Sequence, residues 1–233
     1  MKLEKSSKSD DPIPRRWYDD ACGTALALEF VGERWSLLVM RELMLGPRRF
    51  SELKADLTGI SANVLTQRLE GLERSGIVRR RKLPAPARVQ VYELTEWGLE
   101  AEPIFQEMGR WAVRSPLHDP MRPLSAVSAM LSLRTMIRPD RKPLSMTVAF
   151  RFPGSVFVGW LTPEGLAIER GETEDAEVTF DTDTTTFVGL VYGKRPFRQA
   201  EEEGRLRLGG DRRLARRFVD CFALPERLDA EGP

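Results

Sequence analysis

Three polar side chains between residues 63 and 67 are of types that read DNA bases. Asn63, Thr66 and Gln67 project from one side of an expected helix whose other side is a leucine stripe. Asparagine and glutamine amides pair bidentately with adenine, and threonine contacts a thymine methyl group or hydrogen-bonds a base edge. The alternative is an ordinary solvated helix face, since polar residues stand opposite the apolar stripe on any surface helix.

The basic residues that follow favour base reading. Six basic side chains and no acidic one lie between residues 74 and 88, namely Arg74, Arg79, Arg80, Arg81, Lys82 and Arg88. Such a run repels itself unless an anion is nearby. Strand-like segments at 77–78 and 89–92 flank it, and Pro84 and Pro86 interrupt regular pairing between them. The pattern predicts a hairpin with Arg88 near its tip, placed for a phosphate or the minor groove.

Two short helices position these groups. Phe50, Leu53 and Leu57 give an amphipathic helix over 49–57, and Thr58-Gly59 breaks it. Ser61 offers a hydroxyl to cap a second helix that buries Leu65, Leu69 and Leu72 and ends at Ser75-Gly76. Residues 46–98 therefore predict a winged helix-turn-helix.

The stretch from Asp20 to Arg114 resembles the HxlR-type branch of bacterial winged-helix transcription regulators. The resemblance is carried by ALALEFVGERWSLLVMRELMLGPRRFSEL, ISANVLTQRLEGLERSGIVRR and VYELTEWG. It implies a homodimer that binds a palindromic double-stranded DNA operator, with the helix from Ser61 as recognition helix and Arg88 on the wing. One departure is that Pro84 and Pro86 are separated by Ala85, where the family often has adjacent prolines.

The predicted DNA-binding residues have different tasks. Asn63, Thr66 and Gln67 read bases, and Ser61 begins their helix. Arg68 lies on the flank of the helix, where it makes either a backbone contact or an internal salt bridge. The phosphate contacts are assigned to Arg48, Arg49, Arg80 and Arg88.

A helix over 96–114 is the predicted dimer surface. Its apolar residues, which include Leu99, Ile104, Met108 and Trp111, exceed what a small winged-helix core readily absorbs. The alternative is that this helix packs only on a first long helix over 25–39 of the same chain. Two-fold symmetry would link two half-site contacts into one binding event.

Length divides the chain of 233 residues into more than one unit. The expected divisions are a flexible arm over 1–19, the winged-helix and dimerisation domain over 20–115, a proline-marked linker over 116–123, a second domain over 124–228 and a tail over 229–233. The fold class is α+β: a winged helix followed by a mostly antiparallel sheet covered by helices. Helices are expected at 124–137, 184–192, 196–203 and 211–224, and strands at 144–152, 155–161, 165–170, 176–180 and 205–208.

The second half is similar to sterol-carrier-protein-like domains, with the clearest pattern in DAEVTFDTDTTTFVGLVYGKRPFRQAEEEGRLRLGGDRRLARRFVDCF. The resemblance implies an apolar cavity and a small apolar effector. The alternatives are that these side chains are simple core, or that the domain only serves assembly. The candidate cavity residues are Met130, Leu133, Met136, Phe150, Trp160, Phe187, Val191, Phe197 and Phe218.

Enzyme chemistry finds no support in the sequence. The single histidine, His118, lies in the proline-rich linker and is expected to be solvated, so no Ser-His-Asp or Cys-His arrangement can form around a cleft. No phosphate-binding glycine loop occurs, and no metal or cofactor is expected. No run is apolar enough for a membrane span or signal core, which predicts a cytoplasmic protein with no membrane partner.

The two cysteines are expected to remain thiols. Cys22 precedes the first long helix, where several HxlR-type regulators carry a cysteine that senses oxidants or electrophiles, and a helix N-terminus lowers a thiol pKa. The preferred alternative is a small buried residue. Cys221 is expected in the core of the last helix.

The predicted function is a dimeric, sequence-specific repressor whose C-terminal domain binds an apolar effector. Two alternatives stay open: a redox- or electrophile-responsive regulator switched through Cys22, and a lipid-binding carrier that uses the winged helix mainly to dimerise.

Overall fold

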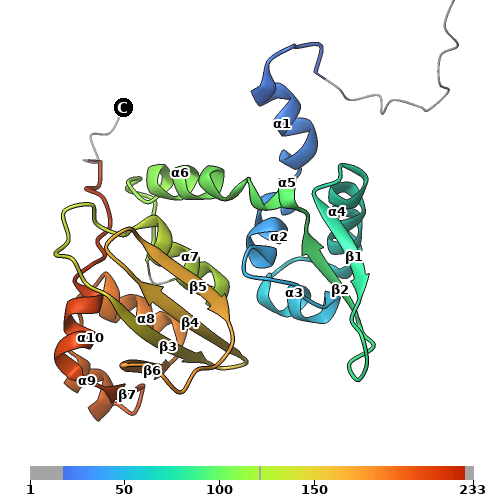
Figure 1. Ribbon diagram of the computed structural model, residues 1–233. Helices are drawn as coiled ribbons and strands as arrows, with labels where there is room; N and C mark the ends of the chain where they lie inside the picture. The colour runs from blue at the N-terminus through green and yellow to red at the C-terminus, as the bar shows by residue number, and fades with distance from the viewer. Residues whose placement is uncertain (1–17, 121, 229–233) are drawn as a thin grey trace, which may run out of the picture.

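The computed structural model describes residues 18–120 and 122–228. A two-stranded and a five-stranded sheet lie at opposite ends of the molecule, with helix α6 running between them (Figure 1). We call the part from α1 to α6 the N-terminal lobe and the part from α7 to α10 the C-terminal lobe. The expected tail at 229–233 and nearly all of the expected arm at 1–19 lie outside the described residues, and the domain boundaries stay predictions.

The N-terminal lobe has the order of a winged helix-turn-helix. Its elements are α1 (Gly23–Val31), α2 (Ser36–Leu43), α3 (Phe50–Asp56), α4 (Ala62–Arg74), β1 (Val78–Lys82), β2 (Gln90–Leu94), α5 (Glu96–Leu99) and α6 (Glu102–Ala112). Strands β1 and β2 pair antiparallel from Val78↔Leu94 to Lys82↔Gln90. The predicted pair of helices and hairpin are therefore confirmed.

Two helices expected to be continuous are broken. The helix predicted over 25–39 is two helices, because Gly32 closes α1 and Trp35 takes a left-handed φ of 82° before α2. The helix predicted over 96–114 is likewise split into α5 and α6 at Glu100 and Ala101. Both breaks let the chain change direction between packed elements.

Leucines hold the N-terminal lobe together. Leu53 of α3 and Leu65, Leu69 and Leu72 of α4 are at most 1% exposed, and they pack with Val39 of α2 in one cluster. Burying a leucine side chain stabilises a fold by roughly 1.5–3 kcal/mol relative to leaving it exposed. This packing fixes which side of α4 faces outward.

The C-terminal lobe is a sheet with helices on one face (Figure 1). Its elements are α7 (Ala126–Thr135), β3 (Met146–Phe152), β4 (Ser155–Leu161), β5 (Leu166–Arg170), β6 (Val178–Thr182), α8 (Thr184–Val191), α9 (Phe197–Glu202), β7 (Leu206–Gly210) and α10 (Arg212–Val219). The strand order is β5-β4-β3-β6-β7, and all neighbours are antiparallel except β3 and β6. The mixed α and β composition and mostly antiparallel sheet are as predicted.

Phenylalanines fill the space between sheet and helices. Phe150 of β3 contacts Phe180, Phe187 and Phe218, with ring centroids between 5.5 and 6.2 Å apart. The predicted cavity residues are largely members of this closed core rather than the walls of a cavity. Eight of the nine are buried, namely Met130, Leu133, Met136, Phe150, Phe187, Val191, Phe197 and Phe218.

Trp160 was wrongly placed in that cavity. Its side chain is 39% exposed, because it lies one residue from Gly159 and so points to the opposite face of the sheet. Gly159 pairs with Val148 on the helix-covered face, and a Cβ there would stand 3.0 Å from the Phe150 ring. The ring of Phe150 therefore occupies the space that a side chain at 159 would need.

Charged groups fill the junction between the lobes. The fully buried carboxylate of Glu42 accepts hydrogen bonds from Arg41 at 2.7 Å and from the Ser125 hydroxyl, which caps α7, at 2.7 Å. Burial, together with the nearby positive charge of Arg48, lowers the pKa of Arg170 on β5 to about 10. At the junction, Glu42 of α2 is thus hydrogen-bonded to the residue that caps α7, and Arg170 of β5 is buried within the electrostatic reach of Arg48 and Glu42.

Candidate nucleic-acid interface

Helix α4 presents a polar face. The Ser61 hydroxyl accepts a hydrogen bond from the Val64 N–H at 3.2 Å, so the predicted N-cap is confirmed. Asn63, Thr66 and Gln67 are all exposed, opposite the buried leucines. The side chains that could read bases are therefore accessible from solvent.

One flank of α4 is in contact with the chain itself. Arg68 donates from Nε to the Arg34 carbonyl at 2.9 Å and pairs with the Glu33 carboxylate at 3.1 Å. Of the two roles predicted for Arg68, the structure shows the internal salt bridge. Gln67 lines a hollow between α1 and α4 together with Phe30, so it lies toward the α1 side of the helix.

Most of the wing arginines are paired, which the sequence count did not reveal. Arg79 and Arg81 both bind the Glu93 carboxylate across the hairpin, at 2.7 and 2.8 Å. Arg80 pairs with Glu73 at the end of α4, at 2.7 Å. Glu73 and Glu93 both lie outside residues 74–88, the segment that has six basic side chains and no acidic one. Arg80 is held against the protein rather than extended toward a phosphate.

The pairing changes the pKa values of these groups. Burial alone would raise the pKa of Glu93, but hydrogen bonds from Arg81 and Arg79 outweigh it and the pKa is lowered. The hydrogen bond and charge of Glu73 raise the pKa of Arg80. Both shifts favour the charged forms of Glu93 and Arg80.

Three cations near the hairpin are left for an external anion. Arg74, Lys82 and Arg88 are exposed, and among the described residues no acidic partner is found for them. Arg88 lies in the loop between β1 and β2, where its N–H donates to the Pro84 carbonyl at 3.2 Å. The predicted position of Arg88 in the wing loop is confirmed.

Arg48 does not belong to a surface for phosphate. Arg48 is only 7% exposed. Its guanidinium pairs with Asp56 and lies 3.6 Å from the Glu52 carboxylate, and its backbone forms an isolated β-bridge with Tyr92 of β2. It ties α3 to the wing, which corrects the sequence prediction. Arg49 is exposed, and its N–H donates to the Glu52 carboxylate at 2.7 Å to start α3.

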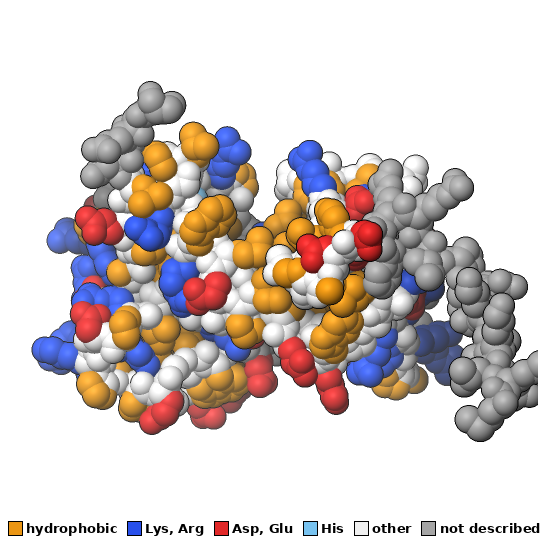
Figure 2. Space-filling model, turned by 90° about the horizontal axis from the view of Figure 1, so that it is seen from above, with side chains coloured by type: hydrophobic (Ala, Val, Ile, Leu, Met, Phe, Trp, Pro, Cys, Tyr) orange, Lys and Arg blue, Asp and Glu red, His pale blue; other side chains and the backbone are white. Residues whose placement is uncertain are grey.

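Large apolar side chains are exposed along the predicted dimer surface. Helix α6 has no buried residue, and Ile104, Met108 and Trp111 are 51%, 47% and 77% exposed. It does not pack solely on residues 25–39: Arg110 donates to the Thr135 carbonyl of α7 at 2.7 Å, and Glu102 pairs with Arg134 at 2.9 Å. Figure 2, which views the molecule from above, shows hydrophobic side chains gathered in several clusters on the surface.

The two cysteines lie in different environments. Cys22 is exposed at the N-cap of α1, and backbone hydrogen bonds from Thr24 and Ala25 lower the pKa of its thiol. The alternative expectation, that Cys22 is a small residue buried in the dimer region, stays a prediction, because the exposure is that of a single chain. Cys221 is 4% exposed in the core, as predicted, and burial raises its pKa.

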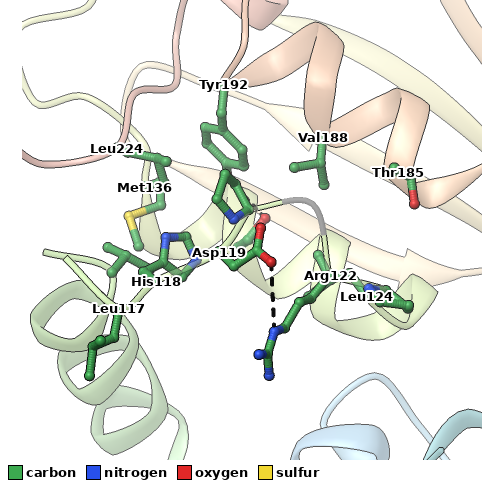
Figure 3. Close-up of a pocket in the computed structure, with 14 residues that line it drawn as sticks. Leu117, His118, Asp119, Arg122, Leu124, Met136, Thr185, Val188, Tyr192 and Leu224 are labelled. Carbon is green, nitrogen blue, oxygen red and sulfur yellow. Dashed lines mark hydrogen bonds and ion pairs between the residues drawn. The ribbon is translucent and has the colours of Figure 1, made fainter. Parts of the chain in front are cut away.

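A pocket opens beside the predicted linker (Figure 3). It has a volume of about 450 Å³ and lies between residues 113–124, α7 and α8. His118, which was expected to be solvated, is half-buried and lines this pocket. The linker is also held from the other end of the chain, since Arg227 donates to the Pro116 carbonyl at 2.8 Å. Met136 is the predicted cavity residue found here.

Other kinds of site are not seen in the described part of the chain. No group of three potential metal ligands of the His, Cys, Asp or Glu type occurs among residues 18–120 and 122–228. Over the same residues no helix has the length and apolarity of a membrane span.

A capped helix with an exposed polar face, next to a hairpin with free cations, defines a winged helix-turn-helix DNA-binding protein. Residues 30–118 match the HxlR-like helix-turn-helix family. The HTH-type transcriptional regulator YodB of Bacillus subtilis (strain 168) is 41% identical over 86 residues, covering 37% of this chain and 77% of that protein. The uncharacterized HTH-type transcriptional regulator YvaP of the same organism is 39% identical over 87 residues, covering 37% and 80%.

Among solved structures, the reduced form of YodB from B. subtilis is 38% identical, covers 40% of this chain and 92% of that chain, and has a TM-score of 0.37. The sequence relatives show that the chain belongs to the HxlR-like helix-turn-helix family and is a transcriptional regulator of this type.

Proposed function

We propose that this regulator is a homodimeric, operator-specific repressor that reads bases with Asn63, Thr66 and Gln67. One observation carries the proposal: the leucine packing of α4 holds these three side chains outward, next to wing cations without internal partners. Phosphate contacts then come from Arg49, Arg74, Lys82 and Arg88, which orient the helix in the major groove. A dimer seated on a promoter represses by excluding polymerase.

Dimerisation is supported by the apolar surface of α6. An exposed tryptophan with isoleucine and methionine on the same short helix is costly to leave in water. A two-fold axis through this surface buries it on both chains at once and offers two recognition helices to a palindrome.

Operator selection from random duplexes, followed by gel shifts, tests base reading. We expect Asn63→Ala and Gln67→Ala each to weaken operator binding by roughly 1–3 kcal/mol and to relax preference at one position per half-site. Gln199→Ala, which removes an exposed glutamine from α9, is the matched control and should change nothing. Unaltered sequence preference in both α4 variants would contradict the assignment, and failure of the wild type to select any duplex would favour the carrier alternative.

For the C-terminal lobe we propose an effector-binding role, in line with its resemblance to sterol-carrier-protein-like domains. The helix-covered sheet and a pocket with apolar walls support this role. Effector binding regulates the DNA contact only if the two dimer geometries have different affinity for the effector.

Cys22 supports a second candidate function, a redox- or electrophile-responsive regulator. Its exposed thiol at the start of α1 has a lowered pKa, and a larger thiolate fraction speeds reaction with oxidants and electrophiles. Operator binding by wild type and Cys22→Ser is measured before and after diamide treatment. Loss in the wild type alone supports the switch, and equal behaviour of both proteins contradicts it.

A further inference from the structure

We propose that the pocket between residues 113–124, α7 and α8 binds an uncharged, mainly apolar molecule that donates one hydrogen bond to Tyr192. This site replaces the cavity expected inside the phenylalanine core. The regulatory consequence rests on the proposed function, but binding itself does not.

The size and walls of the pocket suit a small organic molecule. Its volume of about 450 Å³ falls within the range of ligand sites, roughly 300–1,000 Å³. Its apolar walls include Val113, Leu124, Met136, Val188 and Leu224. Burial of an apolar body against these side chains provides the main driving force for binding.

The polar groups deep in the pocket specify the ligand chemistry. The Tyr192 hydroxyl donates to the Ser132 hydroxyl at 2.8 Å, and Ser132 in turn donates to the Ala129 carbonyl at 2.7 Å. Both hydroxyl hydrogens are therefore engaged, whereas the phenol oxygen of Tyr192 still has acceptor capacity. A ligand hydroxyl can satisfy it, but a carboxylate has no hydrogen to donate.

The charges near the pocket cancel at its mouth. Arg122 lies 3.7 Å from the Asp119 carboxylate, and both side chains are at least half exposed. Burial raises the pKa of Tyr192, so the phenol stays neutral. Arg122 and Asp119 are the Arg and Asp residues among the described lining, and they pair with each other, so an ionised ligand would lose hydration without an unpaired Arg or Asp to compensate it.

The pocket also touches the helix that carries the dimer surface. Val113 directly follows α6, and α6 is fastened to α7 by the Arg110 hydrogen bond to Thr135 and the Glu102 ion pair with Arg134. A ligand between Val113 and α8 would change how α6 packs against α7. The end of α6 at Ala112, directly before Val113, would move with it and alter the spacing of the recognition helices.

Binding of N-phenyl-1-naphthylamine, a neutral fluorescent probe, tests the site in the full-length protein. We expect saturable fluorescence enhancement that 1-decanol displaces at least tenfold more effectively than decanoate. Val188→Trp should fill the pocket and abolish probe binding, whereas Val156→Trp, on the opposite face of the sheet, should bind as the wild type does. Tyr192→Phe should keep probe binding but weaken decanol binding by about threefold to tenfold.

Circular dichroism and operator gel shifts on the same preparations separate the possible failures. Equal probe binding by wild type and a folded Val188→Trp overturns the location, and equal displacement by decanol and decanoate overturns the ligand class. If either occurs while operator binding is retained, the pocket proposal fails and the proposed DNA-binding function stands.

Discussion

The two lobes differ in how far they bury their large apolar side chains. In the N-terminal lobe, neither α1 nor α6 has a buried residue, and Leu28, Ile104 and Trp111 are exposed. In the C-terminal lobe, six phenylalanines are less than 2% exposed within one sheet-and-helix core. The C-terminal lobe therefore buries its phenylalanines within one chain, whereas the N-terminal lobe exposes the large apolar side chains on which the proposed dimer interface rests.

The first test of this comparison removes a ring from the phenylalanine core of the C-terminal lobe. Phe150→Ala should destabilise the C-terminal lobe by about 3–5 kcal/mol, because the ring contacts three other phenylalanines and cannot be replaced by water. Urea unfolding followed by circular dichroism measures the change. Trp160→Ala, on the open face of the sheet, should cost far less, and an equal loss for both would mean that the core is not closed.

The second test addresses the incomplete surface. Trp111→Arg places a charge in the centre of the α6 face and should convert the dimer to monomer, with operator affinity lower by roughly 100-fold or more as two linked half-sites become separate. Sedimentation velocity and gel shifts measure the two effects. Trp160→Arg adds the same charge to the other lobe and should leave both unchanged; a Trp111→Arg protein that remains dimeric would refute the α6 interface.

The third test concerns the junction that joins the two types of lobe. Ser125→Ala removes both the α7 cap and a hydrogen bond to the buried Glu42 carboxylate, and should cost about 2 kcal/mol. Asp211→Ala removes an N-cap from α10 at an exposed position, so it should cost only about 1 kcal/mol. Thermal unfolding of both variants compares them, and equal losses would show that the Glu42 contact adds nothing.

Sequence patterns predicted elements well where period and end signals agreed. Strand β4 and helix α8 lie within a residue of expectation, because alternation and the Asp183 cap are local signals. Trp160 was misassigned although strand parity could have found it: Gly159 faces Phe150, so the next residue must face away. The prediction for Trp160 rested on the hydrophobicity of its side chain and not on its register in the strand.

The site shows a different limit of sequence reasoning. The exposure of Asn63, Thr66 and Gln67 could be predicted because helical spacing fixes the direction of their side chains. The pairing of Arg79 and Arg81 with Glu93 could not be read from a local charge count, because hairpin register brings together residues more than ten positions apart. The pocket was missed for a related reason: the segment between α6 and α7, both α7 and α8, and Leu224 near the end of the described chain all contribute to it, and no single segment carries its pattern.

The smallest predicted effect separates free wing cations from paired ones. Arg88→Ala should weaken binding to all duplexes alike and reduce the slope of log affinity against log salt by about 0.9 for each phosphate that the arginine neutralises. Arg79 is the matched control, since its guanidinium is held in an ion pair with Glu93, which it shares with Arg81. We therefore expect Arg79→Ala to change the slope less, and gel shifts across a salt series measure both. If the two variants gave equal slopes, wing arginines would contact phosphates whether or not they were paired, and pairing would not define the DNA-binding surface.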